Sequence, residues 1–403
     1  MKILKYVLLF LSFFSPVFSQ GWFVQSSGTP YNLSSVYFVN DLTGWAVGDL
    51  GTIRKTTNGG TNWFAQSGSS ALSSVYFINT TTGWGAGPGG LIIKTTNAGD
   101  NWAAQSSGVT TQLRAIFFVN SSKGWAAGDG GVIRYSSDGG ASWNPQTSGT
   151  VETLFSIFFS GETLGWISGA NGKIINTSSG GTNWISQTTS TTFHFYSISF
   201  VDQFTGWAVG YQGIIRKTTN SGVNWIEQTS NVSNWLYSVQ FINSFTGYAC
   251  GTTGTIITTQ NGGLNWSAQT TPVGDNLYGL RFSSASTGYA VGTTGRIIKT
   301  TNGGITFISP VSNQVPENFG LSQNYPNPFN PVTELGLRIT DFGLVNLTIF
   351  DAAGSKTETL FDDNLPAGTY KITWNASKYG SGVYFCRFTA GKFSQTIKMI
   401  LIK

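Results

Sequence analysis

Short stretches of alternating apolar and polar residues run through most of the chain, and they recur as one unit. In the first copy, alternation at Val36 and Phe38 predicts a strand, and residues 44–47, 52–55 and 62–66 predict three more. Clusters of Gly, Asn, Ser and Thr separate these stretches, which favours strands joined by tight turns. Each unit is therefore predicted to be a four-stranded antiparallel sheet.

A Gly-Trp or Gly-Tyr dipeptide marks the second predicted strand of every copy. The first step between dipeptides is 39 residues and every later step is 41. The dipeptides are Gly44-Trp45, Gly83-Trp84, Gly124-Trp125, Gly165-Trp166, Gly206-Trp207, Gly247-Tyr248 and Gly288-Tyr289. Four-stranded units of roughly 40 to 45 residues build β-propellers. We predict an all-β fold whose main part is a seven-bladed β-propeller of four-stranded antiparallel blades.

Two columns of the repeat never change, and both indicate burial between blades. The first strand always ends in Phe, at Phe38, Phe77, Phe118, Phe159, Phe200, Phe241 and Phe282. The third strand always begins with Ile, at Ile53, Ile92, Ile133, Ile174, Ile215, Ile256 and Ile297. Identical residues in seven local contexts point to one shared packing environment.

The connections within each unit follow two turn patterns. Two-residue loops bracketed by Gly, such as GDLG, are predicted between the second and third strands. The next connection, TTNGGTNW in the first copy, has the pattern known as the Asp-box or bacterial neuraminidase repeat. Its Asn or Asp side chain can accept hydrogen bonds from backbone N–H groups, and its Gly permits a positive φ. Its aromatic residue anchors the turn on the blade. We interpret it as a structural turn on the face opposite the usual binding surface of a propeller.

The N-terminal residues resemble a spare fourth strand. Trp22 lies 41 residues before Trp63, and the last unit ends in an imperfect fourth strand at residues 307–310. We therefore expect residues 22–26 to pair into the seventh blade and close the ring.

The ends of the chain predict export. Residues 1–19 carry Lys2 and Lys5, a short apolar run and a small residue, as in a secretory signal peptide. We place the propeller at residues 20–310, a linker at 311–319 and a second domain at 320–403, and expect no transmembrane segment after signal cleavage. Cys250 and Cys386 occupy apolar columns of different domains, so we interpret them as core residues and not as a disulfide.

Composition argues against several chemistries. The net charge of +5 is spread thinly over the chain, so no nucleic-acid partner is predicted. His194 is the single histidine, and no Ser, His and acid constellation or metal-ligand cluster can be assembled around it. We predict no catalytic residue, no metal and no cofactor.

The repeat string GWAVGDLGTIRKTTNGGTNW resembles the photosystem II assembly and stability factor family of seven-bladed propellers, over roughly residues 22–307. In photosynthetic members an arginine cluster is implicated in contacting the reaction-centre protein. The resemblance carries this role to Arg54, Arg134 and Arg216, in the column after the invariant Ile. Four other units place Ile in that column, so a half-buried packing position with a snorkelling Arg is the alternative interpretation.

The C-terminal blocks LSQNYPNPFNPVTELGLRI, VNLTIFDAAGSK, LPAGTYKITWNA and SGVYFCRFTAG resemble a type A sorting domain of the type IX secretion system. Alternating strands at residues 345–350, 370–374, 383–388 and 397–402 predict a small Ig-like β-sandwich. The resemblance implies that the secretion machinery handles residues 320–403. It places the protein in the medium or on the outer surface, reached through the periplasm.

Specificity is expected where units differ, at the connection entering each first strand. Six residues there form a candidate binding site at the mouth of the propeller channel: Tyr31, Glu152, Phe193, His194, Trp235 and Asp275. Aromatic rings beside acids suit a peptide or a sugar. Ordinary loop residues capping the blades are the alternative.

Three function classes follow from these features. We expect a non-catalytic exported propeller that binds a protein or a surface glycan. A photosystem II assembly or stability role is the first alternative, and a sialidase-type secreted glycosidase is the second. No Arg-Ile-Pro segment and no paired carboxylates support the enzyme, since the propeller's acids are scattered over turns and loops.

Overall fold

The computed structural model describes residues 21–68, 70–304, 308–312, 315–341, 343–365 and 367–403. They fall into two compact units, Gly21–Gly304 and Ile305–Lys403. The described residues form β-strands and short 3-10 turns without an α-helix, which confirms the all-β class. The predicted signal peptide, residues 1–19, lies outside the described residues.

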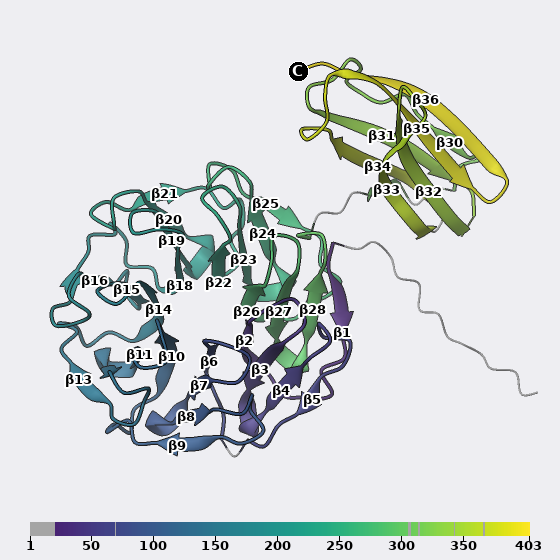
Figure 1. Ribbon diagram of the computed structural model, residues 1–403. Helices are drawn as coiled ribbons and strands as arrows, with labels where there is room; N and C mark the ends of the chain where they lie inside the picture. The colour runs from purple at the N-terminus through teal and green to yellow at the C-terminus, as the bar shows by residue number, and fades with distance from the viewer. Residues whose placement is uncertain (1–20, 69, 305–307, 313–314, 342, 366) are drawn as a thin grey trace, which may run out of the picture. The chain divides into compact units, whose positions relative to one another are not determined.

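Seven four-stranded sheets form the first unit, and their blades follow one another around a ring (Figure 1). The first blade contains β2 (Leu33–Phe38), β3 (Gly44–Gly48), β4 (Ile53–Thr56) and β5 (Phe64–Ala65). The second contains β6 (Ser74–Phe77), β7 (Gly83–Ala86), β8 (Ile92–Thr95) and β9 (Ala103–Gln105). The third contains β10 (Leu113–Phe118), β11 (Gly124–Gly128), β12 (Ile133–Ser136) and β13 (Asn144–Gln146). The fourth contains β14 (Leu154–Ser160), β15 (Leu164–Gly169), β16 (Ile174–Thr177) and β17 (Ile185–Ser186).

The later blades repeat this order, with the first strand innermost. The fifth contains β18 (Phe195–Phe200), β19 (Gly206–Gly210), β20 (Ile215–Thr218) and β21 (Ile226–Gln228). The sixth contains β22 (Leu236–Phe241), β23 (Gly247–Gly251), β24 (Ile256–Thr259) and β25 (Ser267–Gln269). The seventh contains β26 (Leu277–Phe282), β27 (Gly288–Gly292), β28 (Ile297–Thr300) and β1 (Phe23–Gln25).

The N-terminal strand closes the ring, as predicted. Purple β1 lies against green β28 in Figure 1, and the two pair antiparallel with Val24 opposite Ile298. The Trp22 ring meets Phe282 edge to face at 5.9 Å, and its Nε1 donates to Gln269 Oε1 at 2.7 Å. Backbone pairing and a buried indole therefore join the two ends of the propeller.

An aromatic sandwich joins each blade to the next. Trp45 of the first blade stacks on Phe77 of the second at 3.5 Å, and Trp102 meets the same Phe edge to face at 5.8 Å. The Gly of the dipeptide lies under this ring, since a Cβ at Gly83 would be 2.5 Å from Phe77. The same stack occurs at Trp84–Phe118, Trp125–Phe159, Trp166–Phe200, Trp207–Phe241, Tyr248–Phe282 and Tyr289–Phe38. The Gly and the Trp of the dipeptide thus serve two neighbouring sandwiches.

The Asp-box turns are structural, and they receive the stacked tryptophans. Thr56 Oγ1 accepts from Gly60 N at 2.8 Å, and Asn58 Oδ1 accepts from Asn62 N at 2.9 Å. Trp45 Nε1 donates to Ala98 O in the turn of the next blade at 3.0 Å. Equivalent bonds run from Trp84, Trp125, Trp166, Trp207 and Tyr289 to the following turn.

The hairpins between second and third strands are one residue longer than predicted. Gly48 N donates to Thr52 O at 3.0 Å, and Thr52 N donates to Asp49 O at 3.0 Å, which encloses three residues. Left-handed φ values at Leu50 and Gly51 make this turn possible. The 3-10 turns are η1 (Asp49–Gly51), η2 (Pro88–Gly90), η3 (Asp129–Gly131), η4 (Tyr211–Gly213), η5 (Thr252–Gly254) and η6 (Thr293–Gly295).

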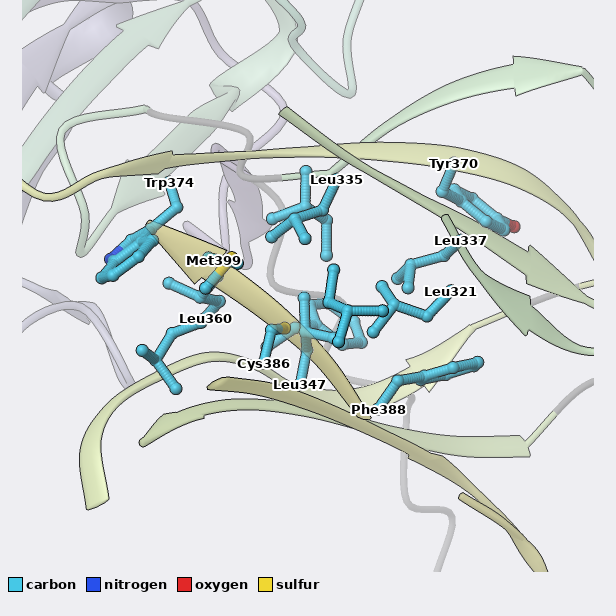
Figure 2. Packing of buried hydrophobic residues seen from close by; sticks show 14 of the residues in the cluster. Leu321, Leu335, Leu337, Leu347, Leu360, Tyr370, Trp374, Cys386, Phe388 and Met399 are labelled. Carbon is cyan, nitrogen blue, oxygen red and sulfur yellow. The ribbon is translucent and has the colours of Figure 1, made fainter. Parts of the chain in front are cut away.

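The second unit is a sandwich of two four-stranded sheets. One sheet has the order β29 (Ile308–Ser312), β34 (Gly368–Asn375), β31 (Val332–Ile339) and β30 (Gly320–Leu321). The other has the order β33 (Lys356–Leu365), β32 (Gly343–Asp351), β35 (Gly382–Ala390) and β36 (Phe393–Leu401). Figure 2 shows their side chains meeting in one core, with Leu335 and Trp374 from the first sheet and Leu347, Cys386 and Met399 from the second.

One segment lies elsewhere than the sequence suggested. The sequence predicts that residues 308–310 end the propeller and that 311–319 form a linker. In the structure β29 pairs with β34 of the second unit, with Ile308 opposite Ile372. The seventh blade takes its fourth strand from β1, so it has no place for this segment. The boundaries 20–310, 311–319 and 320–403 as such stay predictions.

Both cysteines are free and fully buried, as predicted. Cys250 lies in β23 and its Sγ contacts Leu277 O at 3.4 Å, while Cys386 lies in the core of the second unit. Burial raises the pKa of both thiols, which keeps them protonated.

Deleting residues 20–27 should lower the melting temperature of the protein by at least about 6 °C. Removal of a buried Trp costs about 3–5 kcal/mol, and 1 kcal/mol corresponds to roughly 2–4 °C in a domain of this size. Differential scanning calorimetry measures the change. Val24→Ala is the matched control, because Val24 is 46% exposed and keeps its backbone pairing. An unchanged melt after the deletion would contradict the latch.

Gly124→Ala should destabilise the propeller by about 3 kcal/mol, because the new Cβ would lie 2.5 Å from the Phe118 ring. Urea unfolding followed by tryptophan fluorescence gives this free energy. Gly274→Ala is the control, since no atom lies within 4 Å of a Cβ there. Its expected change is within about 0.5 kcal/mol. Equal costs at both positions would show that the aromatic sandwich does not require Gly.

Candidate functional site

The innermost strands of the blades surround a central cavity of about 400 Å³. Its lining falls into two rings of side chains, one at each end of these strands. The mouth ring consists of Ser34, Ser73, Arg114, Phe155, Tyr196, Tyr237 and Tyr278. The inner ring, toward the Asp-box face, consists of Tyr37, Tyr76, Phe117, Phe158, Ser199, Gln240 and Arg281. Blades five to seven therefore place a Tyr in the mouth ring and a polar residue in the inner ring. Blades one to three place a polar residue in the mouth ring and a Tyr or Phe in the inner ring.

Between the two rings, small residues tie the innermost strands together. Ser197 Oγ accepts from Val239 N of the next blade at 3.1 Å, and Ser238 Oγ accepts from Leu280 N at 3.2 Å. Since these strands have no sheet partner on the channel side, the serines satisfy backbone donors that would otherwise be unpaired.

Aromatic residues gather on blades five and six, and we call Phe193, Tyr196, Tyr211, Trp235 and Tyr237 the mouth wall. Trp235 lies 4.8 Å from Tyr211 and 6.3 Å from Tyr196, measured between ring centroids. Phe193 meets Tyr211 at 5.5 Å. Phe193 is 40% exposed and Trp235 is 38% exposed, so the wall offers ring surface to solvent. Three of the predicted residues belong to this cluster: Phe193, Trp235 and His194, whose ring lies 6.1 Å from Tyr196 and 6.2 Å from Tyr211.

Two phenols of the mouth wall, those of Tyr196 and Tyr237, stay protonated. Burial raises the pKa of Tyr237 to about 12, with neighbouring tyrosines adding to the shift, and burial raises the pKa of Tyr196 as well. These groups can donate hydrogen bonds at neutral pH.

His194 fastens the neighbouring blade. Its Nδ1 accepts from Asn171 N at 2.9 Å, in the hairpin of the fourth blade. At equivalent positions Asn276 Oδ1 accepts from Thr253 N and Asn32 Oδ1 accepts from Thr294 N, each at 3.0 Å. The bond places the ring proton of His194 on Nε2. Trp235 occupies the same column without such a bond from its ring, and it stacks with the mouth wall.

The predicted acids are engaged by their surroundings. Asp275 accepts from Arg296 Nε at 2.8 Å and from Thr294 Oγ1 at 3.1 Å. Glu152 Oε2 accepts from Asn171 Nδ2 at 2.8 Å. Both carboxylates hold hairpins of their own region, which is a structural role.

The three arginines of the third-strand column lie on alternate blades and form no cluster. Arg54 donates to Gly28 O at 2.7 Å, and Arg134 donates to Gly108 O at 3.0 Å. Arg216 pairs with Glu227 on the adjacent strand at 3.0 Å. Each guanidinium therefore contacts its own blade or the preceding link. Tyr31, 45% exposed, enters the first blade, two blades beyond Trp235 in ring order.

Sequence reasoning missed Tyr196, Tyr211 and Tyr237 of the mouth wall. Tyr196 and Tyr237 directly follow the buried first residue of their strand, in a column that reads Ser, Ser, Arg, Phe, Tyr, Tyr, Tyr along the seven copies. That run of aromatic residues in four consecutive units was the available signal.

Among the residues that the structure describes, no group of three or more His, Cys, Asp or Glu side chains is placed to hold a metal ion. The described part of the chain also contains no helix long and apolar enough to span a membrane.

Comparison with known proteins agrees with this architecture. Residues 141–232 match the family model described as photosynthesis system II assembly factor YCF48. Residues 323–403 match the model described as secretion system C-terminal sorting domain. No curated protein sequence matches the chain.

Several solved propellers are similar in structure. A structure described as YCF48 bound to D1 peptide has a TM-score of 0.61 and 20% identity, covering 70% of this chain and 95% of that one. YCF48 from Cyanidioschyzon merolae gives 0.60 and 19%, covering 69% and 98%. The WD40 propeller domain of Doa1 gives 0.58 and 13%, covering 70% and 97%. At these identities the likeness shows the fold alone.

In class, the protein is a seven-bladed β-propeller joined to a C-terminal sorting domain. In particular, residues 141–232 of the propeller are similar to the photosystem II assembly factor family, and residues 323–403 are similar to the C-terminal sorting domain of the secretion system. The sorting domain indicates secretion to the cell surface or the medium, handled by the type IX machinery.

His194→Ala should destabilise the propeller by about 0.5–1.5 kcal/mol, because Asn171 N loses its acceptor. Urea unfolding measures the free energy, and hydrogen exchange should be faster at the Asn171 amide. His194→Asn is the matched control, since Asn32 and Asn276 make the same bond in their blades. If the Asn171 amide exchanges equally fast in both variants, the hydrogen bond from Asn171 N to His194 does not stabilise the hairpin.

Proposed function

We propose that this protein is an exported, non-catalytic binding propeller whose mouth wall holds an extended segment of a partner protein. The type IX sorting domain takes the propeller to the cell surface or the medium, where the partner is met. The carrying observation is the exposed ring cluster at the mouth, built around Trp235 and Phe193.

The geometry of the mouth wall supports binding of a chain segment. Interfaces take much of their energy from Trp and Tyr side chains in the centre of a contact. Here rings from three connections are packed against one another, so they need little further ordering when a ligand arrives. Protonated phenols at Tyr196 and Tyr237 supply donors for backbone carbonyl groups.

A similar structure supports a peptide over a surface glycan. YCF48 has been described in a complex with a D1 peptide, so one propeller of this architecture holds a peptide. We extend this kind of ligand, and not the D1 protein itself, to the present chain.

The engagement of the acids supports a role without catalysis. A glycosidase needs two carboxylates at one cleft, one as acid and one as nucleophile or base. At this mouth Asp275 is paired with Arg296, Asp129 with Arg114, and Glu152 with Asn171. The matches to YCF48 and WD40 propellers point the same way. A sialidase-type activity is the alternative that a glycan-hydrolysis assay tests.

A photosystem II assembly role is the other alternative, favoured by the match over residues 141–232. The sorting domain argues against it, because a chain exported to the outer surface leaves the compartment of a photosynthetic membrane. Finding photosystem genes in the source genome, with this protein co-purifying with the reaction centre, would support that role instead.

Trp235→Ala should weaken partner binding by about 2 kcal/mol, or roughly thirtyfold, because it removes the central ring of the mouth wall. The measurement is a pull-down from the source cell envelope with full-length protein, followed by titration of the captured partner. Ile185→Ala is the matched control, since Ile185 is a 63% exposed apolar residue on an outer strand.

Capture lost with Trp235→Ala and kept with Ile185→Ala supports the proposal. Capture that is unchanged in both variants would place the binding surface elsewhere. Capture abolished by deglycosylating the envelope, but resistant to proteolysis, would assign the mouth wall to a glycan.

A further inference from the structure

The central cavity holds a positive charge that its own walls do not neutralise. Of the described residues that line it, Arg114 and Arg281 are charged, and no Asp or Glu is among them. Arg114 donates to both carboxylate oxygens of Asp129, at 2.6 and 3.2 Å. Arg281 forms no ion pair within the described part of the chain, and its Nε is buried without an acceptor.

Arg281 differs in this respect from other arginines of the propeller. The Nε atoms of Arg54 and Arg134 are also buried and unpaired, yet their terminal nitrogens donate to backbone carbonyls. An uncompensated guanidinium in a confined site is costly, and it gains most from an anion that enters the site.

The surroundings of Arg281 hold its side chain without neutralising it. Its guanidinium lies over the Tyr37 ring at 4.2 Å, and Tyr37 lies 4.7 Å from Tyr76. Burial raises the pKa of Tyr76, so this phenol is a donor and not a counter-ion. Gln240 is occupied by Phe282, accepting from its N at 2.7 Å and donating to its O at 3.2 Å.

We propose that the inner ring of the channel binds a carboxylate, held by Arg281 beside the Tyr37 and Tyr76 rings. A guanidinium matches a planar carboxylate through two parallel N–H donors. A cavity of about 400 Å³ has room for a chain end or one sugar residue and not for a folded domain. The carboxylate is therefore that of a peptide C-terminus or of an acidic sugar. This site does not depend on the mouth wall binding a protein segment.

Isothermal titration calorimetry on full-length protein at low ionic strength tests the site with matched pairs of probes. One pair is N-acetyl-Gly-Gly-Ser with a free carboxylate and its C-terminal amide, and the other is glucuronic acid and glucuronamide. At least one acid should bind ten times more tightly than its amide. The pair that shows the preference identifies the source of the carboxylate. No preference in either pair overturns the proposal.

Two variants connect the preference to one side chain. Arg281→Met should abolish the preference without lowering the melting temperature of the free protein, because it removes an unpaired charge and keeps an apolar stem. Arg281→Lys should keep a reduced preference for the acid over the amide, since the positive charge stays but the two parallel N–H donors of the guanidinium are lost. Arg54→Gln, outside the channel, should leave the preference unchanged. Retention of the full preference in Arg281→Met would overturn the assignment.

The two binding proposals fail independently in this design. Trp235→Ala should leave the small carboxylate probes bound as in the unchanged protein, because it alters the mouth wall and not the inner ring. A variant that loses envelope capture but still binds the carboxylate probes tests the mouth wall alone. A variant that loses probe binding but keeps envelope capture tests Arg281 alone.

Discussion

The contact on which the propeller depends is the aromatic sandwich between neighbouring blades. One Phe ring lies between the Gly of its own blade and the Trp or Tyr of the preceding blade, with a second Trp at its edge. The stacked Trp also donates to the Asp-box turn of the next blade. Because each sandwich takes parts from two blades, no blade can bury its apolar surface alone. Ring closure through Trp22 is the same contact supplied from the other end of the chain.

This arrangement separates the scaffold from the channel. The sandwich uses side chains that point between blades, and serines such as Ser197 and Ser238 accept from backbone N–H groups of the innermost strands. Some of the other channel-facing residues also bond the next blade, such as Gln240 with the Phe282 backbone and Ser199 Oγ with Phe241 N, but none of them belongs to the sandwich. They can vary among Ser, Tyr, Phe, Gln and Arg from one blade to the next while the columns around them repeat. The chemistry of the channel thus varies from blade to blade while the residues of the sandwich stay the same.

Sequence reasoning reached the parts that the repeat itself encodes. The period, the invariant Phe and Ile columns, the Asp-box turns and the closing strand all follow from aligning seven copies. Tyr196 and Tyr237 of the mouth wall did not follow, because a β-bulge shifts the register after the first residue of most inner strands, as between Phe195 and Ser197. Simple alternation predicts that the Tyr196 side chain lies between blades, whereas the bulge directs it into the channel. The hydrogen bond that His194 accepts from Asn171 N could not be predicted either, since Asn171 lies in another blade.

The two channel rings impose an orientation on any ligand. In blades five to seven the rings Tyr196, Tyr237 and Tyr278 stand at the mouth, above Ser199, Gln240 and Arg281. In blades one to three the aromatic residues belong to the inner ring, where Tyr37 supports the guanidinium. Each of these six blades supplies one bulky ring and one polar or charged side chain. A ligand that stacks on the mouth would therefore meet polar groups further inside the same blades. Ser199 and Gln240 are hydrogen-bonded, whereas Arg281 Nε has no acceptor. An apolar or aromatic body that ends in a carboxylate would match both levels.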